Sequence, residues 1–519
     1  MADIVLVNPK FEASYWGLEH ALPFFGKRAN VPVACLPLLA ALTPDDHEVT
    51  LVDENVEAID FERLARADIV GITGMSVQRA RMKTLLERLA DQDVCVVVGG
   101  PWITVKEDDF DGLADVVFIG ESEETWPQFL REWQEGSHHR RYEQAEPTDM
   151  TRVPTPRFDR LKMEHYLLGS VQFSRGCPFE CEFCDIIVIF GRRPRLKTSR
   201  QVIQELEAIR VQRVAAVFVV DDNLIGNKKA IKSILRDVIK WQQAEGYPLT
   251  FFTEASIDLA EDDEMMRLMT EANFVTVFIG VESPNEASLR ETKKFQNVRK
   301  GTLTDKIHTI QNAGLEVWCG MIVGFDHDDD SIFASQRRFI RESRIQHAMI
   351  GMLVAIPKTP LYKRLADEGR LDDSDKPSCG TNVIPLRLSR EELRDGYVRL
   401  MQDLYEPEAY FDSLDGLYLD DDFQYALPRG RYWRRHPVNW LKAQTTSLIR
   451  FLYLYRRLTH DIPDSRLRQC YRTRLRRAVR RRPDPDMLLV YAIKCGMHYH
   501  HHTMATQMAR RETDVVNSF

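Results

Sequence analysis

Three cysteines stand close together in the middle of the chain, at Cys177, Cys181 and Cys184. Thiolates are the usual ligands of iron–sulfur clusters, and three of them can hold three irons of a four-iron cube. The fourth iron then keeps an open position, which a bidentate ligand such as the amino and carboxylate groups of S-adenosylmethionine (SAM) can occupy. The C-x3-C-x2-C spacing therefore predicts a [4Fe–4S] cluster that binds a small molecule at its open iron.

Two other uses of these cysteines fit the sequence less well. A structural zinc site would need a fourth Cys or His nearby, and the nearest candidates, His165 and Asp185, are not suitably spaced. The remaining six of the nine cysteines are scattered along the chain, which is not the pattern of a disulfide framework. Zinc stays as the alternative metal, and the cluster is the prediction.

The cysteine loop lies at the start of a series in which strands and helices alternate. The expected strands are 170–174, 216–220, 250–254, 275–281, 316–323 and 349–356. Segments with helical periodicity lie between them. Six β/α units predict a partial (β/α)6 barrel over residues 169–365, with active residues on loops at the carboxyl ends of the strands.

Polar residues and glycines follow these strands in an order that resembles the radical SAM superfamily, as does the C-x3-C-x-aromatic-C loop itself. The resemblance implies contacts to SAM from Phe183, Asp221, Asp222, Asn223, Glu254, Ser256, Glu282, Ser283, Gly324 and Ile356. It also implies that the reduced cluster cleaves SAM to a 5′-deoxyadenosyl radical, with the protein positioning the cofactors. The alternative for any one of these positions is an ordinary polar loop residue, or simple core packing for Phe183.

The first part of the chain also alternates strand and helix. Short, β-branched apolar runs mark the expected strands at 4–7, 49–52, 69–72, 94–98 and 116–119. Such runs separated by helices predict a parallel sheet that is covered on both faces. Residues 1–145 are therefore expected to form a doubly wound, Rossmann-like α/β domain that binds its ligand beyond the carboxyl ends of the strands.

Placed before a radical SAM barrel, this domain resembles the cobalamin-binding domain of the B12-dependent radical SAM class. The resemblance implies contacts to cobalamin from residues at the strand ends, namely Asp53, Asn55, Thr73, Gly74, Met75, Ser76, Gly99, Gly100 and Glu121. The D-x-H-x-x-G loop of methionine-synthase-type domains is absent, so we expect cobalamin without a histidine as its lower ligand. An empty or repurposed Rossmann-like domain is the alternative. A methylthiotransferase is disfavoured, because it would need further cysteines for an auxiliary cluster.

The remainder of the chain changes character twice. Residues 146–168 are polar and contain prolines, which predicts a linker. After residue 365 the strand pattern largely stops, so residues 366–519 are expected to form a helical C-terminal domain with apolar segments at 440–455 and 487–497. The tail of this domain is basic, because residues 429–482 contain 17 Lys or Arg and two Asp, although the whole chain has a net charge of −8.

The basic tail has more than one interpretation. Its cations could pair with the acidic remainder of the chain, or they could contact anionic lipid headgroups beside the aromatic 440–455 segment. Nucleic acid is disfavoured as a partner. No apolar run is long enough to span a membrane, and the N-terminus lacks a signal-peptide pattern, so we expect a cytoplasmic protein with a possible peripheral contact to the inner face of the membrane. The histidines at 498–502 are expected to be incidental and not a metal site.

Residues 185–197 and the helical tail resemble the branch of this class that contains hopanoid C-2 methylases. The resemblance predicts a B12-dependent radical SAM methyltransferase that acts on an unactivated carbon, with a polycyclic lipid such as a hopanoid as one candidate substrate. Its expected partners are a small-molecule or lipid substrate and a low-potential electron donor such as flavodoxin or ferredoxin. Two alternatives are a radical SAM cyclase or rearrangement enzyme without methyl transfer, and a non-catalytic cobalamin-binding sensor.

Overall fold

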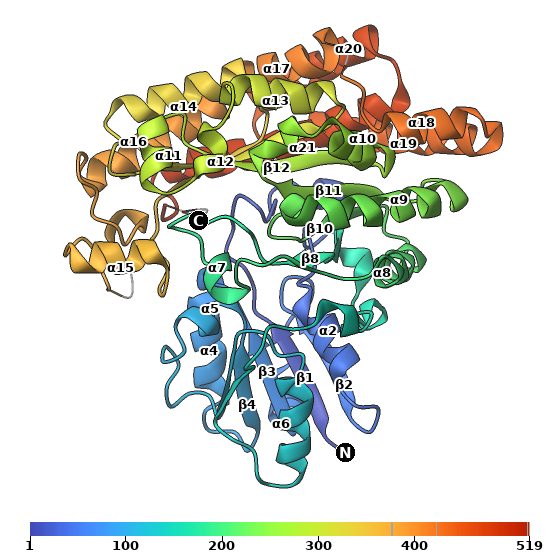
Figure 1. The fold of residues 1–519 in the computed structure, drawn as a ribbon. Coiled ribbons are helices and arrows are strands. Elements are labelled where there is room, and N and C mark those ends of the chain that lie inside the picture. Colours follow the sequence, from blue (N-terminus) through green and yellow to red (C-terminus); the bar gives the residue numbers. More distant parts are fainter. Residues whose placement is uncertain (375–376, 422, 516, 518–519) are drawn as a thin grey trace.

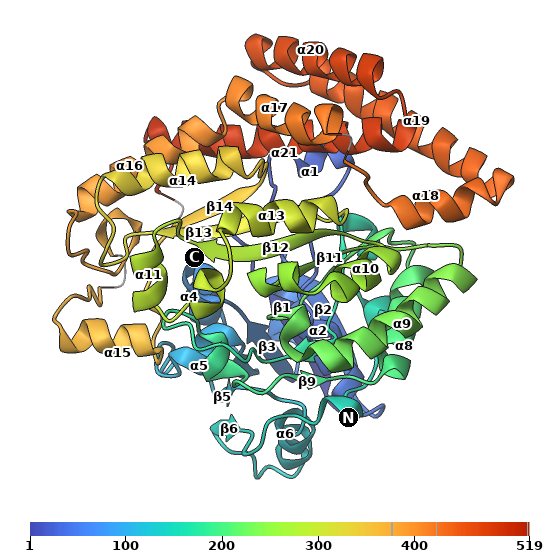
Figure 2. The same ribbon diagram turned by 45° about the horizontal axis from the view of Figure 1, so that its top comes forward.

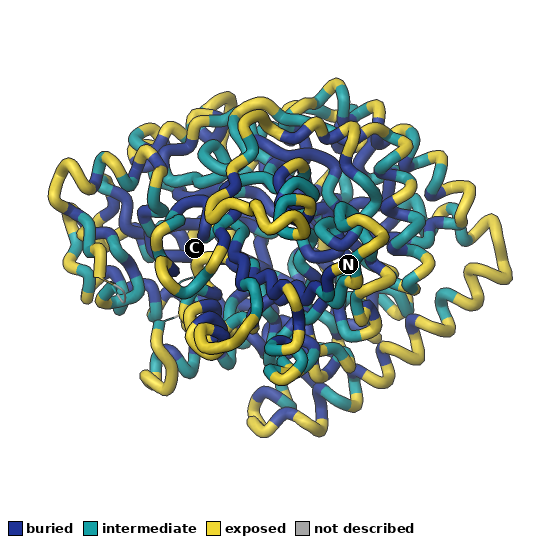
Figure 3. Tube along the Cα trace, turned by 90° about the horizontal axis from the view of Figure 1, so that it is seen from below, coloured by how far each residue is buried: buried dark blue, intermediate teal, exposed yellow. Residues whose placement is uncertain are grey.

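The computed structural model describes residues 1–374, 377–421, 423–515 and 517. Two six-stranded parallel sheets form its core, and they lie one above the other in Figure 1. The N-terminal sheet is the lower of the two, and most of the helices after residue 389 lie over the second sheet on the side away from the first (Figures 1 and 2). Buried residues concentrate in the strands and inner helix faces, and exposed ones lie on the outer helices and loops (Figure 3).

The N-terminal sheet has the strand order β2-β1-β3-β4-β5-β6. Its strands are β1 (Asp3–Asn8), β2 (Glu48–Asp53), β3 (Ile69–Thr73), β4 (Cys95–Gly99), β5 (Val116–Ile119) and β6 (Arg141–Glu143). The helices that cover it are α2 (Cys35–Leu42), α3 (Phe61–Ala65), α4 (Arg79–Leu89), α5 (Pro101–Val105) and α6 (Thr125–Gln134). Along β1, Val5 and Val7 belong to one buried cluster and Ile4 and Leu6 to another, so each face of the sheet has its own core. This confirms the predicted doubly wound domain.

The second sheet has the order β14-β13-β12-β11-β10-β7, with β7 and β14 at its edges, so it is a partial barrel as predicted. Its strands are β7 (Gly169–Val171), β10 (Ala216–Val219), β11 (Thr250–Ala255), β12 (Phe274–Glu282), β13 (Glu316–Val323) and β14 (Ala348–Met352). The main helices between them are α8 (Ser199–Val211), α9 (Lys228–Ala244), α10 (Asp263–Glu271), α13 (Leu303–Asn312) and α14 (Ser331–Glu342).

Three strand predictions need correction. The strand expected at 170–174 ends at Val171, and a separate strand, β8 (Ser174–Arg175), follows it and pairs antiparallel with β9 (Arg195–Leu196). The strand expected at 349–356 ends at Met352. A sixth N-terminal strand, β6, was not expected. Strands of two or three residues carry too little alternation to be recognised in a sequence.

The C-terminal region is helical, as predicted. It contains α15 (Pro360–Asp367), α16 (Arg390–Leu404), α17 (Pro407–Asp415), α18 (Leu427–Arg434), α19 (Pro437–His460), α20 (Ser465–Arg481) and α21 (Pro485–Ala509). The apolar segment at 440–455 lies in α19, and the one at 487–497 lies in α21, where Lys494 forms a buried ion pair with Glu316 of β13. None of the described helices combines the length and the apolar character that crossing a bilayer would need.

Part of the chain between β1 and α2 reaches the second sheet and the C-terminal helices. Tyr15 stacks on His501 of α21 with ring centroids 4.2 Å apart, and Trp16 contacts Phe278 of β12 at 5.1 Å. His501 is buried, as are His498 and His500 of the same helix. Residues early in the chain therefore complete the core between the second sheet and α21, and these histidines serve as core residues.

Candidate functional site

The three cysteines lie on a loop that leaves β8 and returns through α7 (Ile186–Ile189) to β9. Gly176 begins this loop with φ of 93°, and a Cβ there would lie 3.0 Å from the carbonyl oxygens of Gly191 and Arg193. Only glycine tolerates both the left-handed conformation and this close approach. Cys177 N–H also donates to the Gly191 carbonyl at 3.3 Å. The base of the loop is thus closed by backbone contacts.

The chemistry around the three sulfur atoms suits an iron–sulfur cluster. Burial raises the pKa of both Cys177 and Cys184, and the neighbouring Cys181 thiol raises each further. Asn223 Nδ2 lies 3.8 Å from the Cys177 sulfur and Gln296 Nε2 lies 3.6 Å from the Cys181 sulfur. Thiolates this buried need compensating positive charge and N–H donors, which iron together with these amides would supply. In the described part of the chain, no three His, Cys, Asp or Glu side chains lie together as candidate ligands of a single metal ion. The three cysteines are expected to bind three different irons of one cluster.

Two of the predicted SAM residues hold the start of this loop. Asp221 accepts hydrogen bonds from Phe173 N–H at 2.7 Å and from the Ser174 hydroxyl at 2.6 Å. Asp222 accepts from Gly176 N–H at 2.7 Å. Burial raises the pKa of Asp221 to about 6 and that of Asp222 to about 7. The end of β10 is therefore tied directly to the residue before Cys177.

Carboxylates gather at the ends of the next two strands. Burial, together with the charges of Asp222 and Glu282, raises the pKa of Glu254 to about 8. No hydrogen-bond partner of the Glu254 carboxylate is found among the described residues. Glu282, in contrast, accepts from Lys294 Nζ at 2.6 Å and has φ of 63° at a register shift in β12. A cationic ligand at this point would relieve the repulsion between the acidic groups, and SAM carries both a sulfonium and an ammonium group.

The other predicted SAM positions fall into two groups. Asn223 and Ser256 contact each other beside Cys177, with Asn223 Nδ2 3.1 Å from Ser256 Oγ, while Ser283 is fully buried beyond β12. Gly324, Ile356 and Phe183 lie toward β13 and β14, where the Phe183 and Phe325 rings are 6.2 Å apart. The structure thus brings most of the predicted residues to one edge of the second sheet. Their contacts to SAM stay predictions.

The sequence reasoning missed Lys294. This residue lies between α11 (Glu286–Glu291) and α12 (Phe295–Val298), with Nζ 5.8 Å from the centre of the Phe183 ring. Burial lowers the pKa of Lys294, but Glu282 and the Cys181 thiol outweigh this effect and raise it. The Lys293-Lys294 pair soon after the fourth strand was the only signal in the sequence.

A cavity of about 500 Å³ lies where the carboxyl ends of the two sheets meet. From the N-terminal sheet it is lined by Asn8, Thr73, Gly74, Met75, Gly99, Gly100, Gly120 and Glu121, and from the second sheet and the cysteine loop by Gln172, Arg175, Ile189, Phe190 and Val220. Mostly apolar side chains of residues 31–42 form a further part of the wall. None of the lining residues is a histidine.

Glycines at two strand ends shape the wall of this cavity. Gly100 has φ of 100°, and a Cβ there would lie 2.5 Å from Thr73 Oγ1, whereas a Cβ on Gly120 would enter open space. Glycine therefore keeps the backbone of both strand ends accessible. Of the predicted cobalamin residues, Asp53, Asn55 and Ser76 do not line the cavity. Asp53 is buried and accepts a hydrogen bond from Tyr166 at 2.7 Å instead. The sequence reasoning missed the contribution of residues 31–42 and of the cysteine loop.

Comparison with known proteins places the chain in a family. The radical SAM superfamily profile matches residues 171–338, the B12 binding domain profile matches 30–130, and a domain of unknown function (DUF4070) matches 359–514. The hopanoid C-2 methylase of Rhodopseudomonas palustris is 32% identical over 465 residues, which cover 88% of this chain and 86% of that protein. The chain belongs to the B12-binding branch of the radical SAM superfamily. An uncharacterized methyltransferase of Synechocystis sp., sll1242, is 39% identical over 414 residues, covering 79% of this chain and 77% of that protein.

Solved structures of radical SAM proteins share the fold. TsrM of Kitasatospora setae, a radical SAM methyltransferase solved with cobalamin and a [4Fe–4S] cluster, has a TM-score of 0.59 and 16% identity, covering 76% of this chain and 82% of that one. OxsB, solved with aqua-cobalamin and SAM, has a TM-score of 0.62 and 13% identity, covering 99% of this chain and 82% of that one. The radical SAM match contains the cysteine loop, and the B12 match contains most of the cavity wall contributed by the N-terminal domain.

Replacing Cys177, Cys181 or Cys184 with Ala is expected to remove the cluster, because two thiolates cannot hold the three irons that need a protein ligand. Iron and sulfide are measured after anaerobic reconstitution, and the wild type is expected to hold about four of each. Cys470→Ala, which changes a half-buried cysteine of α20, is the matched control and should keep its iron. Full iron content in all three loop variants would contradict the assignment.

Proposed function

We propose that this protein is a cobalamin-dependent radical SAM methyltransferase that transfers a methyl group to an unactivated carbon. One observation carries the proposal: the cavity of the B12-binding domain extends to Arg175 and Phe190, which flank the cysteine loop. Two cofactor sites that share a wall can act on one substrate. Two relatives that match most of this chain are named a methyltransferase and a methylase, which supports the same reaction.

When bound, the cluster would supply the electron that cleaves SAM to a 5′-deoxyadenosyl radical, and methylcobalamin would supply the methyl group. The roles of the protein residues follow from their positions. Cys177, Cys181 and Cys184 would bind the cluster, while Asp222, Glu254 and Lys294 would orient the charged groups of SAM. The apolar wall contributed by residues 31–42 would exclude water from the cavity. The electron itself would come from a partner such as flavodoxin or ferredoxin.

The methyl-transfer reaction can be tested with SAM that carries a deuterated methyl group. Reconstituted protein with cobalamin, a chemical reductant and a hopanoid as the probe substrate is expected to give labelled lipid together with 5′-deoxyadenosine and S-adenosylhomocysteine. Mass spectrometry measures all three products, and Cys177→Ala should give neither labelled lipid nor 5′-deoxyadenosine.

Other outcomes would contradict the proposal. Formation of 5′-deoxyadenosine with a rearranged, unlabelled lipid product would indicate a cyclase or rearrangement enzyme. Bound cobalamin without any cleavage of SAM by the wild type would indicate a sensor.

SAM binding is expected to depend on pH through the carboxylates at the strand ends. A cationic ligand favours ionised carboxylates, so affinity should rise as the pH rises through about 7 and about 8, the pKa values of Asp222 and Glu254, and level off above them. Glu254→Gln should weaken binding by roughly tenfold or more, since a hydrogen bond to a charged group contributes about 1.5–3 kcal/mol.

Binding is measured by calorimetry on reconstituted protein at several pH values. The control is Glu286→Gln, which makes the same chemical change at an exposed position on α11. Iron content should be the same in all samples. An affinity that neither varies with pH nor falls in Glu254→Gln would remove Glu254 from the SAM site.

A lipid substrate would require contact with a membrane surface, and we propose that α19 makes it. Exposed apolar side chains form a stripe along this helix at Val438, Leu441, Leu448, Ile449 and Leu452. Residues 423–460 contain eight Lys or Arg and no Asp or Glu, so the helix is flanked by cations that would attract an anionic leaflet. In both Figure 1 and Figure 2, α18 and α19 reach the edge of the molecule.

The arginines of α20 are less available for this contact. Arg474 and Arg477 lie 2.9 Å and 3.1 Å from the Asp415 carboxylate of α17, and Arg482 donates to the Tyr418 carbonyl at 2.8 Å. Part of the basic tail therefore pairs within the chain, which was one of the two main interpretations of its charge. Arg476, Arg480 and Arg481 remain exposed.

The membrane contact predicts that the protein co-sediments with anionic vesicles, less at high salt, and only weakly with neutral vesicles. Changing Leu441, Ile449 and Leu452 together to Ser should release it, because these side chains are already exposed and their loss leaves the fold intact. Val211→Ser, at an exposed apolar position on α8, is the control. Equal sedimentation of the triple variant and the control would show that α19 does not face the membrane.

A further inference from the structure

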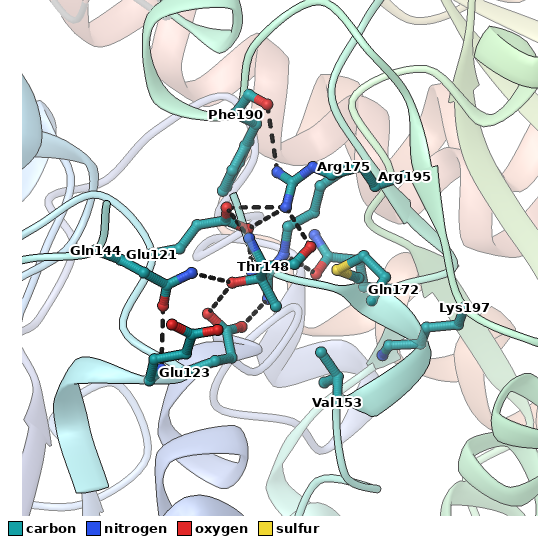
Figure 4. A network of polar contacts seen from close by, with 12 residues as sticks. Glu121, Glu123, Gln144, Thr148, Val153, Gln172, Arg175, Phe190, Arg195 and Lys197 are labelled. Atoms are coloured by element: carbon teal, nitrogen blue, oxygen red, sulfur yellow. Dashed lines mark hydrogen bonds and ion pairs between the residues drawn. The ribbon is translucent and has the colours of Figure 1, made fainter. Parts of the chain in front are cut away.

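Four charged residues with largely buried side chains join the N-terminal domain to the stem of the cysteine loop (Figure 4). Arg175 Nη1 lies 2.7 Å from Glu121 Oε1, and its Nη2 lies 2.6 Å from Glu123 Oε1. Arg195 Nη1 lies 2.9 Å from Glu121 Oε2. Glu121 and Glu123 follow β5, whereas Arg175 and Arg195 belong to β8 and β9. We call these four side chains the interdomain clamp.

The clamp resolves a conflict in the stem of the loop. β8 and β9 pair antiparallel with Arg175 directly opposite Arg195. Like charges at directly opposite positions destabilise a two-stranded ladder, and this ladder has only two residues in each strand. The carboxylate of Glu121 contacts both guanidinium groups. The negative charge that offsets the repulsion between the two arginines therefore comes from the N-terminal domain.

The charges within the clamp balance. Two carboxylates face two guanidinium groups, and all four side chains are at most 15% exposed. Removing one charge from such a set leaves another buried without compensation, which costs more than the pair contributes. The geometry of the stem therefore depends on the position of Glu121.

Hydrogen bonds extend the clamp into the crossover between the domains. Thr148 N–H donates to Glu121 Oε2 at 3.0 Å, and the Thr148 hydroxyl donates to Glu123 Oε2 at 3.0 Å. Arg195 Nη1 donates to the Thr148 carbonyl at 2.7 Å. Because the Glu121 carboxylate already accepts from Arg175, Arg195 and Thr148, little of its hydrogen-bonding capacity remains for a ligand, although it lines the cavity.

The clamp also reaches the wall of the cavity. The Arg175 guanidinium lies 5.6 Å from the centre of the Phe190 ring, and Arg195 Nη2 donates to the Phe190 carbonyl at 3.3 Å. Phe190 lines the cavity, and the neighbouring helix α7 packs on α5. The side chains that join the stem of the cysteine loop to the N-terminal domain therefore also contact one wall of the cavity.

We propose that the interdomain clamp positions the cysteine loop relative to the cavity of the B12-binding domain, and thereby fixes the separation of the two cofactors. The inference rests on the proposed function in taking the loop as the cluster site and the cavity as the cobalamin site. Glu121, Glu123, Arg175 and Arg195 are positioning residues: they act through the loop and the cavity wall and not on the reacting atoms.

The first test uses hydrogen exchange on the full chain without added cofactors. Glu121→Gln is expected to speed exchange of the amides of residues 177–194 by about tenfold, which corresponds to about 1.4 kcal/mol. The control Glu180→Gln makes the same change in the exposed Glu180–Arg192 pair of the same loop and should leave these rates unchanged. Equal exchange rates of these amides in Glu121→Gln and Glu180→Gln would overturn the proposal that the clamp positions the loop. This readout does not depend on the reaction, so it separates the clamp from the proposed function.

The second test measures the separation of the cofactors in the reconstituted protein. Pulsed electron paramagnetic resonance between reduced [4Fe–4S] and cob(II)alamin is expected to give one narrow distance distribution in the wild type and in Glu180→Gln. The charge-balanced double variant, Glu121→Gln with Arg195→Gln, retains the Arg175–Glu123 pair and avoids an unpaired buried charge. It should keep its iron and cobalamin but show a broader or shifted distribution. A distribution identical to that of the wild type would overturn the proposal.

Discussion

The carboxyl ends of two parallel sheets meet at one cavity, and polar loops from both sheets bring charged side chains into its surroundings. An unpaired buried charge costs several kcal/mol, so each of these groups must find a partner or shift its pKa. Glu121, Glu123 and Glu282 find cations and thereby fix the backbone around them. Burial raises the pKa values of Asp222 and Glu254 instead. Asp222 still holds the cysteine loop by accepting from Gly176 N–H, whereas no partner of the Glu254 carboxylate is found among the described residues, which is why we propose Glu254 as a ligand of SAM.

Much of this arrangement could be predicted from the sequence, because strand ends are easy to locate. Runs of four or more residues, most of them apolar, marked most strands, and the polar residues after them fell at one edge of each sheet, as parallel pairing requires. The cysteine spacing alone indicated the cluster. The helical C-terminal region followed from the loss of strand periodicity.

Other features depend on contacts that no local pattern reveals. The β8–β9 stem is too short to show alternation, and its opposed arginines look unfavourable until Glu121 is placed between them. A role for Lys294 can be inferred only once the structure places it beside Glu282 and the cysteine loop. The histidines of α21 resemble a metal-binding run in the sequence, yet burial lowers the pKa of His498 and His501 and keeps them neutral within the core. Tertiary context decided each of these cases.

The packing of the segment after β1 against α21 has a consequence for the order in which this protein is assembled. Tyr15 contacts Tyr405 and His501, partners that are separated from it by 390 and 486 positions in the chain. Contacts of such long sequence separation form slowly, because the entropy of closing a large loop is lost before the contacts contribute favourable free energy. On the ribosome, the N-terminal sheet can form early, but the residues around Tyr15 must wait until α21 has been synthesised. During that interval an aromatic segment stays exposed on the nascent chain, and a chaperone that recognises apolar segments would find its binding site there.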